Sequence, residues 1–305
     1  MFSQRTKALW IALLSLVLSG CTVELAYNNL DRLVLRWLNE KIELTPQQQE
    51  QVKQALDEHL AWHCEAHLPA YADLLNAFQN DLSQGSVTHE RMLEYGDTMA
   101  GFGKDLVTVT RPTAIELLRS LSDAQVTALQ ASFEESNNQL IEQLSQTNPD
   151  DVINERANRM SKRLARFMGK PSQTQRVTIS QWARNYQSTA GFQLAYAYQW
   201  QAKLVEALSI RQLEPAAFEA QIEILFDPGA GWDEAYRTAV MQNQSATWEM
   251  MARVMSQLSD RQKNRMVRKI AGYSGDFEGL SCQADQDFVY SSDKKEAPSG
   301  SLSRS

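Results

Sequence analysis

The sequence predicts an all-α fold, an elongated bundle of long antiparallel helical hairpins, and three observations support this prediction. Leucine, alanine, glutamine, glutamate and arginine are frequent, whereas the 305 residues include 13 glycines and 8 prolines. Such a composition favours helices. No convincing run of alternating apolar and polar residues predicts a strand, and one helix-start signal recurs along the chain.

That signal is a serine or threonine followed three residues later by a glutamine. In this capping box the hydroxyl accepts from the backbone N–H of the glutamine, and the glutamine side chain reaches back to the N–H of the cap. A leucine placed as a hydrophobic staple precedes three of the caps. The spacing is unequal, unlike that of a regular solenoid. The pairs are Thr45/Gln48, Ser122/Gln125, Ser172/Gln175 and Ser259/Gln262.

The order of helices follows from these starts, from apolar periodicity and from the prolines, which we expect at helix ends. A short helix at 25–41 precedes a long one that runs from 45 into the 60s. The remaining helices are expected at 70–82, 87–109, 112–120, 122–146, 150–168, 172–210, 215–226, 231–257 and 259–273. Short turns between long amphipathic stretches are typical of antiparallel hairpins.

The N-terminus has the parts of a bacterial lipoprotein signal peptide. A basic start precedes an apolar run over 8–18, which is too short to span a bilayer. The run ends in "LSGC", which resembles a lipobox. We therefore expect residues 1–20 to be removed and Cys21 to carry acyl chains. Because Thr22 rather than aspartate follows, we expect an outer-membrane anchor on a protein that faces the periplasm.

Residues 21–289 are expected to form an all-helical domain, and the serine-, lysine- and glycine-rich segment 290–305 a disordered tail. The formal net charge is −7 and no long basic run occurs. This balance argues against nucleic acid as a partner. No nucleophile elbow, phosphate-binding glycine loop or zinc-protease motif is present, so neither catalysis nor a cofactor is expected.

Two stretches carry a resemblance to a known family. "ELAYNNLDRLVLRWLNEKIELTPQQQEQVKQALDEHLAWH" and the following "LPAYADLL" resemble an uncharacterised family of Gram-negative outer-membrane lipoproteins, a domain of unknown function. The later "RLARFMGK" and "LSDRQ" fit the same family. The resemblance implies the compartment and a helical fold, and it names no reaction. The repeated L-[ST]-x-x-Q is also similar to the LTxxQ motif of Spy-like periplasmic chaperones, which implies a chaperone-like role.

Three of the four histidines lie four residues apart in the long helix. A helical wheel places His59, His63 and His67 on the apolar stripe, which predicts hydrogen-bonded histidines that face the core. His59 and His63 are also candidate metal ligands, because an i, i+4 pair can hold one zinc ion. All three cannot reach one ion, since they span about 12 Å of helix.

The cysteines allow a single disulfide once Cys21 is lipidated. Cys64 and Cys282 are then the only possible pair, and an oxidising compartment favours the bond. A buried free thiol at Cys64 is the alternative, since the sequence does not give the geometry that a disulfide requires.

The helix expected at 150–168 carries the distinctly basic surface of the chain. On an acidic protein it is a candidate patch for anionic partners, such as lipid head groups, lipopolysaccharide, a cell-wall polymer or an acidic client segment. The alternative is a solvated face that pairs with Glu134, Glu135 and Glu142 of a neighbouring helix. The patch comprises Arg156, Arg159, Lys162, Arg163, Arg166 and Lys170.

The helix nearest the expected anchor has an apolar face. Such a face either lies on the membrane surface or docks onto the bundle, and the family resemblance favours docking. The face comprises Leu30, Leu33, Val34, Trp37 and Leu38.

These features predict a lipid-anchored, periplasm-facing envelope protein with a binding or structural role. Its expected partners are the membrane, reached through the N-terminal lipid, and envelope proteins or anionic envelope polymers. The alternative is a metal-binding or redox protein centred on the helix that carries His59, His63 and Cys64.

Overall fold

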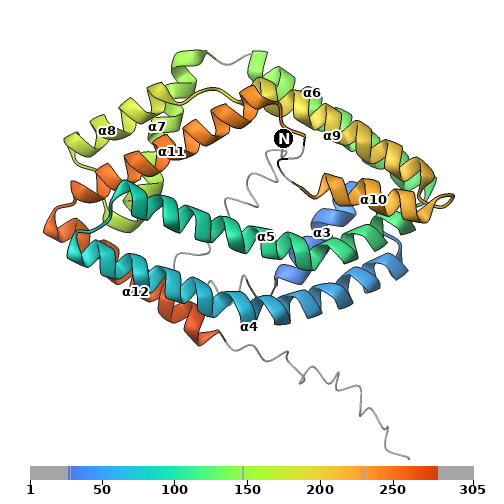
Figure 1. Ribbon diagram of the computed structural model, residues 1–305, viewed down its shortest axis with the longest axis horizontal. Helices are drawn as coiled ribbons and strands as arrows, with labels where there is room; N and C mark the ends of the chain where they lie inside the picture. The colour runs from blue at the N-terminus through green and yellow to red at the C-terminus, as the bar shows by residue number, and fades with distance from the viewer. Residues whose placement is uncertain (1–26, 28, 146–147, 228, 230, 281–305) are drawn as a thin grey trace, which may run out of the picture.

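The structure is a computed structural model that describes residues 27, 29–145, 148–227, 229 and 231–280. The described residues form ten helices and no strand (Figure 1), so the all-α prediction is confirmed. The predicted signal peptide, Cys21, Cys282 and the predicted tail lie outside them. The helices are α3 (Leu30–Ile42), α4 (Pro46–Gln84), α5 (His89–Ser120), α6 (Asp123–Ser145), α7 (Pro149–Met168), α8 (Gln173–Asn185), α9 (Ala190–Ile210), α10 (Pro215–Leu225), α11 (Glu234–Ser256) and α12 (Asp260–Gly279).

The prediction that every proline marks a helix end was wrong at two positions. Pro69 lies inside α4 and Pro112 inside α5. A proline removes one backbone hydrogen bond and disfavours the helix locally, but tertiary packing can outweigh that cost. Here α4 packs along α12 and α5 packs along α11, so both helices continue past their prolines.

The helix predicted over 172–210 is instead broken between α8 and α9. At the break, the backbone N–H of Gln187 donates to Asn243 Oδ1 at 2.9 Å, and Asn243 Nδ2 donates to the carbonyl of Gln187 at 2.9 Å. Asn243 lies on α11 and is buried, so a side chain from elsewhere in the chain replaces hydrogen bonds that the helix would have made.

The chain consists of two halves with the same order of elements. The first half runs from α3 to α6. It begins with a short helix and a capping box, continues with two long helices joined by a turn, and ends with a second box and a final helix. The second half repeats this order from α7 to α12, with α8 and α9 in place of α4, and α10 and α11 in place of α5. The two box glutamines are 77 residues apart in the first half and 87 in the second, where the segment 226–233 separates α10 from α11.

The capping boxes meet in pairs, one pair in each half. Gln125 Nε2 donates to Gln48 Oε1 at 2.7 Å, and Gln48 Nε2 returns a bond to Gln125 Oε1 at 3.3 Å. Gln262 and Gln175 exchange the same two bonds at 3.0 and 3.2 Å. The side-chain amide of each of these four glutamines also donates to a backbone carbonyl. The carbonyl belongs to the residue two positions before the cap of the paired box, so the bond joins the starts of two helices. These carbonyls belong to Ser120, Glu43, Gln257 and Lys170.

Each half contributes helices to the hydrophobic core of the other half. The first core combines α3 to α6 with the hairpin of α9 and α10, and the second combines α7, α8, α11 and α12 with the end of α4. The cores lie toward opposite ends of the long axis (Figure 1). The first core contains Ile42, Leu44, Val52, Ile115, Leu121, Leu129, Leu204, Ala207, Leu208, Phe218 and Ile222. The second contains Leu82, Leu164, Met168, Ile179, Trp182, Ala183, Met250, Val254, Met255, Met266 and Ile270.

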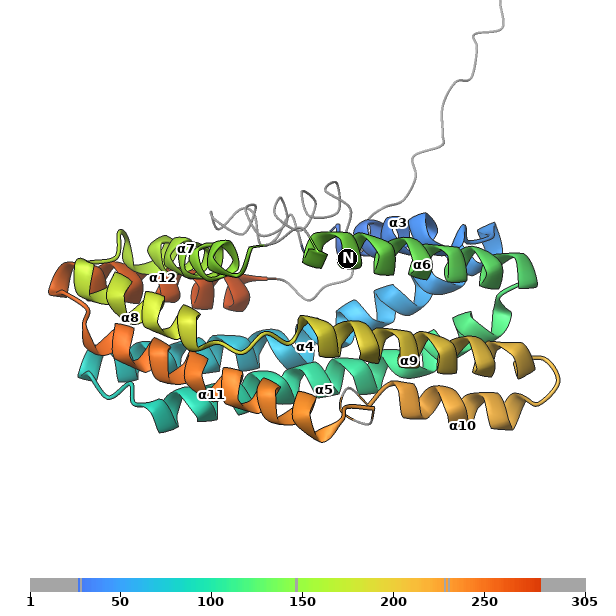
Figure 2. The same cartoon turned by 90° about the horizontal axis from the view of Figure 1, so that it is seen from above.

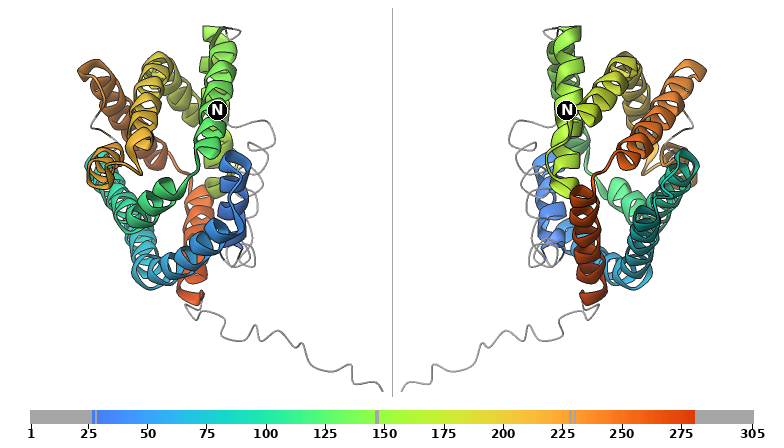
Figure 3. Two further views of the ribbon diagram at one scale, coloured as in Figure 1. Left: turned by 90° about the vertical axis from the view of Figure 1, so that its right-hand side faces the viewer. Right: turned by 90° about the vertical axis from the view of Figure 1, so that its left-hand side faces the viewer.

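The two halves also place corresponding pairs of helices on the same side of the molecule. Helices α3 and α6 at one end, and α7 and α12 at the other, lie along the same side of the molecule (Figures 2 and 3). Within each pair the two helices contact each other, so each half presents one helix pair on this side. Among the described residues, none of the helices has both the length and the apolar character needed to cross a membrane.

The close approach of α5 and α11 depends on a glycine. A Cβ at Gly96 would lie 2.6 Å from Nε1 of Trp248, closer than such atoms can approach. We therefore expect Gly96→Ala to lower the free energy of unfolding by about 1–3 kcal/mol through overpacking. Gly103→Ala, on the same helix with nothing within 4 Å of the new Cβ, should instead raise it by up to about 1 kcal/mol. Chemical denaturation of both variants checks the prediction, and a Gly96→Ala variant that is also stabilised would contradict it.

Candidate functional site

A strongly charged, open hollow lies between the end of α7 and the start of α12. It consists of two cavities of about 460 and 500 Å³ that share Arg265 and Arg268. We call their combined lining the basic pocket, because it contains six cationic side chains. The pocket is lined by Arg166, Met168, Gly169, Lys170, Arg261, Gln262, Arg265, Arg268 and Lys269.

Helix periodicity brings most of these cations together. Arg261, Arg265 and Arg268 lie at i, i+4 and i+7 of α12 and therefore share one face of that helix. Like charges at this spacing repel one another and destabilise a helix. The start of α12 is also the positive end of the helix dipole, where cations are unfavourable. These cations therefore lower the stability of α12 as an isolated helix. An anion bound in the pocket would reduce the repulsion among them.

Two features fix the backbone conformation of the segment that lines the pocket. Gly169 ends α7 with φ +84° and ψ −169°, a conformation that is essentially restricted to glycine, and the side chain of Arg265 lies against it. Gln262 Nε2 donates to the carbonyl of Lys170 at 3.1 Å, so the capping box of α12 also holds the segment that follows α7. The backbone beneath the cations is thus set by the paired boxes.

The cations of the pocket have few acidic neighbours. Among the described residues, no carboxylate lies within ion-pairing distance of the five pocket cations other than Lys269. These five are Arg166, Lys170, Arg261, Arg265 and Arg268, and all are exposed. Lys269 lies over the ring of Tyr273 at 4.9 Å.

The structure divides the basic patch that the sequence predicted. Arg166 and Lys170 line the pocket, whereas Lys162 and Arg163 are exposed on α7 outside it. Arg156 points elsewhere: its Nη1 donates to the carbonyl of Ala183 at 3.0 Å, and its guanidinium lies 4.3 Å from the centre of the Tyr186 ring.

Arg159 also lies apart from the pocket, because it forms an ion pair with Glu155 at 2.7 Å on its own helix. The predicted alternative of pairing with α6 finds no support at Glu134 or Glu135, since no described ion pair joins either residue to α7. Lys162 and Arg163 are therefore the exposed cations of α7 that lie beside the pocket.

The half of the pocket that α12 contributes was not predicted from the sequence. A signal was present in the distribution of acidic residues. Between Glu155 and Glu206 the sequence contains nine lysines and arginines and no aspartate or glutamate, and no acidic residue occurs between Asp260 and Asp276. Two acid-free segments in an acidic chain mark the surfaces that meet at the pocket.

All three histidines are hydrogen-bonded, as predicted, but His67 alone of the three is buried in the core, and His59 and His63 are half-buried. His59 Nε2 lies 2.9 Å from Thr113 Oγ1. His63 lies between two tyrosines, with Nδ1 3.2 Å from the hydroxyl of Tyr27 and Nε2 3.1 Å from that of Tyr71. Both ring nitrogens of His63 therefore have partners.

The hydrogen-bonded chain continues to His67, which lies near a carboxylate of α5. The hydroxyl of Tyr71 lies 3.3 Å from His67 Nδ1, and His67 Nε2 lies 3.6 Å from the carboxylate of Asp105. Burial raises the pKa of Tyr27 to about 12, with a further contribution from Tyr71, so its hydroxyl stays protonated. No group of three or more histidine, cysteine, aspartate or glutamate side chains within the described ranges is placed to hold a metal ion. Stoichiometric metal in the purified protein is the observation that would favour the metal-binding alternative.

The histidine chain predicts a pH dependence of stability. Burial, and then the neighbouring His67, lower the pKa of His63 below its usual value of 6.5. The folded protein thus takes up this proton less readily than the unfolded chain, so stability is full above about pH 6.5 and falls as the pH decreases below it. We expect chemical denaturation to give a lower free energy of unfolding at pH 5.5 than at pH 7.5, and His63→Gln to reduce that difference. His89→Gln serves as the control, and an unchanged difference in His63→Gln would contradict the prediction.

Cys64 lies in α4 between these histidines and is 2% exposed. It is disulfide-bonded, so it does not titrate as a free thiol. Both other cysteines, Cys21 and Cys282, lie outside the described residues, and the pairing of Cys64 with Cys282 therefore stays a prediction.

Helix α3 docks onto the bundle, but the face that packs differs in part from the predicted one: Leu38 belongs to both, whereas Leu35 was not predicted and Trp37 is exposed. Leu35 and Leu38 pack against the first core, in which Ile42 is buried. A cleft of about 230 Å³ remains between α3 and α6, at the place that corresponds to the basic pocket in the other half. Its lining is mainly apolar and includes Leu38, Phe133 and Trp37, whose side chain is 41% exposed.

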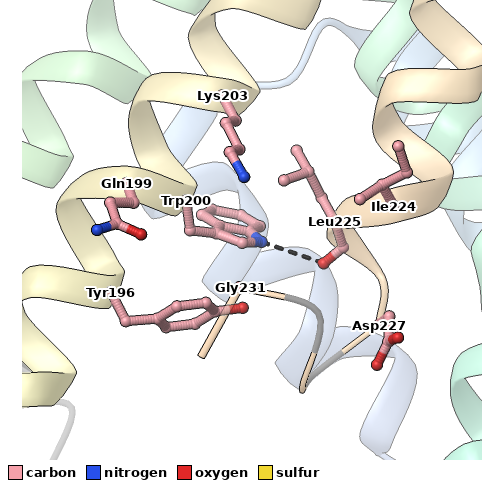
Figure 4. A pocket seen from close by; sticks show the side chains of 8 residues that line it. All are labelled: Tyr196, Gln199, Trp200, Lys203, Ile224, Leu225, Asp227 and Gly231. Carbon is pink, nitrogen blue, oxygen red and sulfur yellow. Dashed lines mark hydrogen bonds between the residues drawn. The ribbon is translucent and has the colours of Figure 1, made fainter. Parts of the chain in front are cut away.

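A third hollow lies between α9 and the end of α10 (Figure 4). Trp200 Nε1 donates to the carbonyl of Leu225 at 3.1 Å, and Tyr196 and Lys203 lie on either side of it in the view. The free volume is about 30 Å³, which corresponds to about one water molecule. This hollow is too small for a ligand and is best described as a packing defect beside the hairpin.

No significant match to this chain is found among curated proteins or among solved structures. A family match is found over residues 40–237, from the end of α3 to the start of α11, which is more than half of the 305 residues. The prediction of an uncharacterised family is thereby confirmed, while the lipoprotein character and the similarity to Spy-like chaperones stay predictions. On this match, the chain belongs to a family of unknown function (DUF6279).

Proposed function

We propose that this protein is a lipid-anchored, periplasm-facing envelope protein that binds an anionic component of the envelope in its basic pocket and catalyses no reaction. The observation that carries the proposal is the set of pocket cations without a described carboxylate partner. The chain as a whole has a formal net charge of −7, so this concentration of positive charge is local. A positively lined hollow attracts and retains anions.

The expected anchor supports this role. A lipid on Cys21 would hold the protein at a membrane, where anionic lipids and polymers are concentrated. Labelling of cells with radioactive palmitate tests the anchor directly. We expect the full-length protein to be labelled and Cys21→Ser to remain unlabelled, whereas equal labelling of both would refute the anchor.

In-cell photo-crosslinking tests binding at the pocket. A photo-reactive amino acid in place of Arg163 lies on α7 beside the pocket without lining it, and one in place of Met241 on α11 is the matched exposed control. We expect an anionic component to be captured from the first position only. Capture should be lost in a variant that also carries Arg265→Gln and Arg268→Gln. Capture that persists in this variant, or that is equal from both positions, would contradict the proposal.

A chaperone-like role is the second candidate, and the apolar cleft between α3 and α6 favours it. The glutamines that carry the LTxxQ similarity do not favour it, because Gln48, Gln125 and Gln175 are buried in helix contacts. If the cleft holds unfolded segments, the protein suppresses aggregation of a model substrate, and Trp37→Ser weakens suppression more than Met241→Ser. Absence of suppression by the unmodified protein would reject this candidate.

A further inference from the structure

We infer that the basic pocket is a site for a phosphomonoester group, the doubly charged phosphate carried at the head of a phosphorylated lipid. This inference rests on the proposed function and specifies its ligand. It is drawn from the number of cations, the predominance of arginine among them, and the fixed backbone beneath them.

The charge of the pocket exceeds what a singly charged anion would neutralise. Five cations without a described carboxylate partner line two hollows that share Arg265 and Arg268, so these two side chains lie at the centre of the positive region. A phosphomonoester carries a charge of about −1.5 to −2 at pH 7 and presents three acceptor oxygens. A carboxylate or a phosphodiester carries a single negative charge, and it leaves more of the repulsion among these cations uncompensated.

The chemistry of the donors also favours phosphate. Four of the six cations are arginines, and arginine binds phosphate oxygens through two parallel N–H groups. A peptide segment would need apolar contacts in addition to its charge, but Met168 is the apolar side chain in the lining. The pocket is therefore suited to a compact polar head group more than to an acidic peptide.

The position of the pocket is compatible with a ligand in a membrane. Helices α7 and α12 lie on the same side of the molecule as α3, the first helix after the expected lipid anchor (Figures 2 and 3). On α7, Lys162 and Arg163 extend the positive surface beyond the pocket, where they face other anionic groups of a membrane surface. A phosphorylated lipid head is therefore the source of the phosphate that we infer.

Calorimetric titration of the full-length protein with defined probes tests the inference. The probes are short-chain phosphatidic acid, glycerol 3-phosphate, short-chain phosphatidylglycerol and a polyglutamate peptide. The test variant carries Arg265→Gln and Arg268→Gln, and the matched control carries Arg159→Gln and Arg253→Gln. The control removes the same charge from two exposed arginines that form ion pairs with glutamates on their own helices.

We expect phosphatidic acid to bind at least about tenfold more tightly than the diester and the peptide, and the test variant to lose at least about tenfold in affinity while the control stays within about twofold. Affinity should fall as the pH is lowered through about 6, where the phosphomonoester takes up a proton. Weaker binding of glycerol 3-phosphate would assign the phosphate to a lipid, whereas equal binding would replace the lipid by a soluble phosphate compound.

Equal, pocket-dependent binding of the diester or the peptide would overturn the inference and leave the proposed anion-binding function intact. No pocket-dependent binding of any probe, together with loss of the crosslink from the Arg163 position, would overturn both.

Discussion

Gln175→Ala is expected to lower the free energy of unfolding by roughly 3 kcal/mol or more, because its amide is fully buried and forms hydrogen bonds at both ends. Its Oε1 accepts from the backbone N–H of Ser172 at 2.7 Å, and its Nε2 donates to the carbonyl of Gln257 at 3.2 Å. The same amide exchanges two bonds with Gln262. Alanine would leave a cap N–H and a partner amide without these bonds and would also leave a void.

Chemical denaturation of the variant measures this loss. Gln139→Ala is the matched control, because Gln139 is only half-buried on α6 and its side chain donates to a single glutamate of its own helix. We expect the control to change stability by no more than about 0.5 kcal/mol. The double variant with Gln262→Ala should cost less than the sum of the single variants, since both remove the same pair of bonds. A Gln175→Ala effect as small as that of the control would show that its box does not stabilise the fold, and additive costs would show that the two boxes stabilise it independently.

Arg211→Met is expected to lower the free energy of unfolding by roughly 2–5 kcal/mol. Arg211 lies at the turn between α9 and α10 and is 6% exposed. Its Nε donates to the carbonyl of Leu121 at 2.8 Å, and its Nη1 donates to that of Leu208 at 2.6 Å. Methionine has similar length but no donors, so these bonds are lost while most of the packing is kept.

The third hydrogen-bond partner of Arg211 should contribute less to stability than the two backbone carbonyls. Nη2 contacts Asp123 Oδ1 at 2.6 Å, but the carboxylate is almost fully exposed. An exposed partner of this kind contributes little, so Asp123→Asn should cost less than about 1 kcal/mol. Denaturation curves for both variants decide between the two roles. If Asp123→Asn proved as costly as Arg211→Met, the ion pair rather than the backbone contacts would account for the role of Arg211.

The local features of the fold could be predicted from the sequence. The box hydrogen bonds of Thr45, Ser122, Ser172 and Ser259 are all present, because a capping box is complete within four residues and needs no information from elsewhere. For the same reason the helical wheel placed His67 correctly in the core, and it placed the half-buried His59 and His63 at its margin on the same helix face. The inward side of a helix is encoded in its own periodicity.

The features that could not be predicted from the sequence depend on residues far away in the chain. Pro69 and Pro112 are tolerated because other helices pack along α4 and α5, and the break after α8 exists because Asn243 supplies hydrogen bonds from α11. The basic pocket combines Arg166 with Arg265, which belong to helices far apart in sequence. A wheel drawn for one helix cannot show which second helix will lie beside it. The shared order of elements in the two halves was hidden by the longer connection between α10 and α11.

The exchange of helices between the cores of the two halves has a consequence for how the chain reaches its native state. Leu82 at the end of α4 is buried with Ile270 of α12, and these partners are separated by most of the chain. Contacts of such high sequence separation slow folding, because a long loop must close before they form. Neither half can complete its own core, so we expect a single cooperative thermal transition for both ends of the molecule. During synthesis, the α4–α5 hairpin is made long before α12 is available to cover it. Its apolar surface is therefore exposed until the C-terminal helix of the domain has been made.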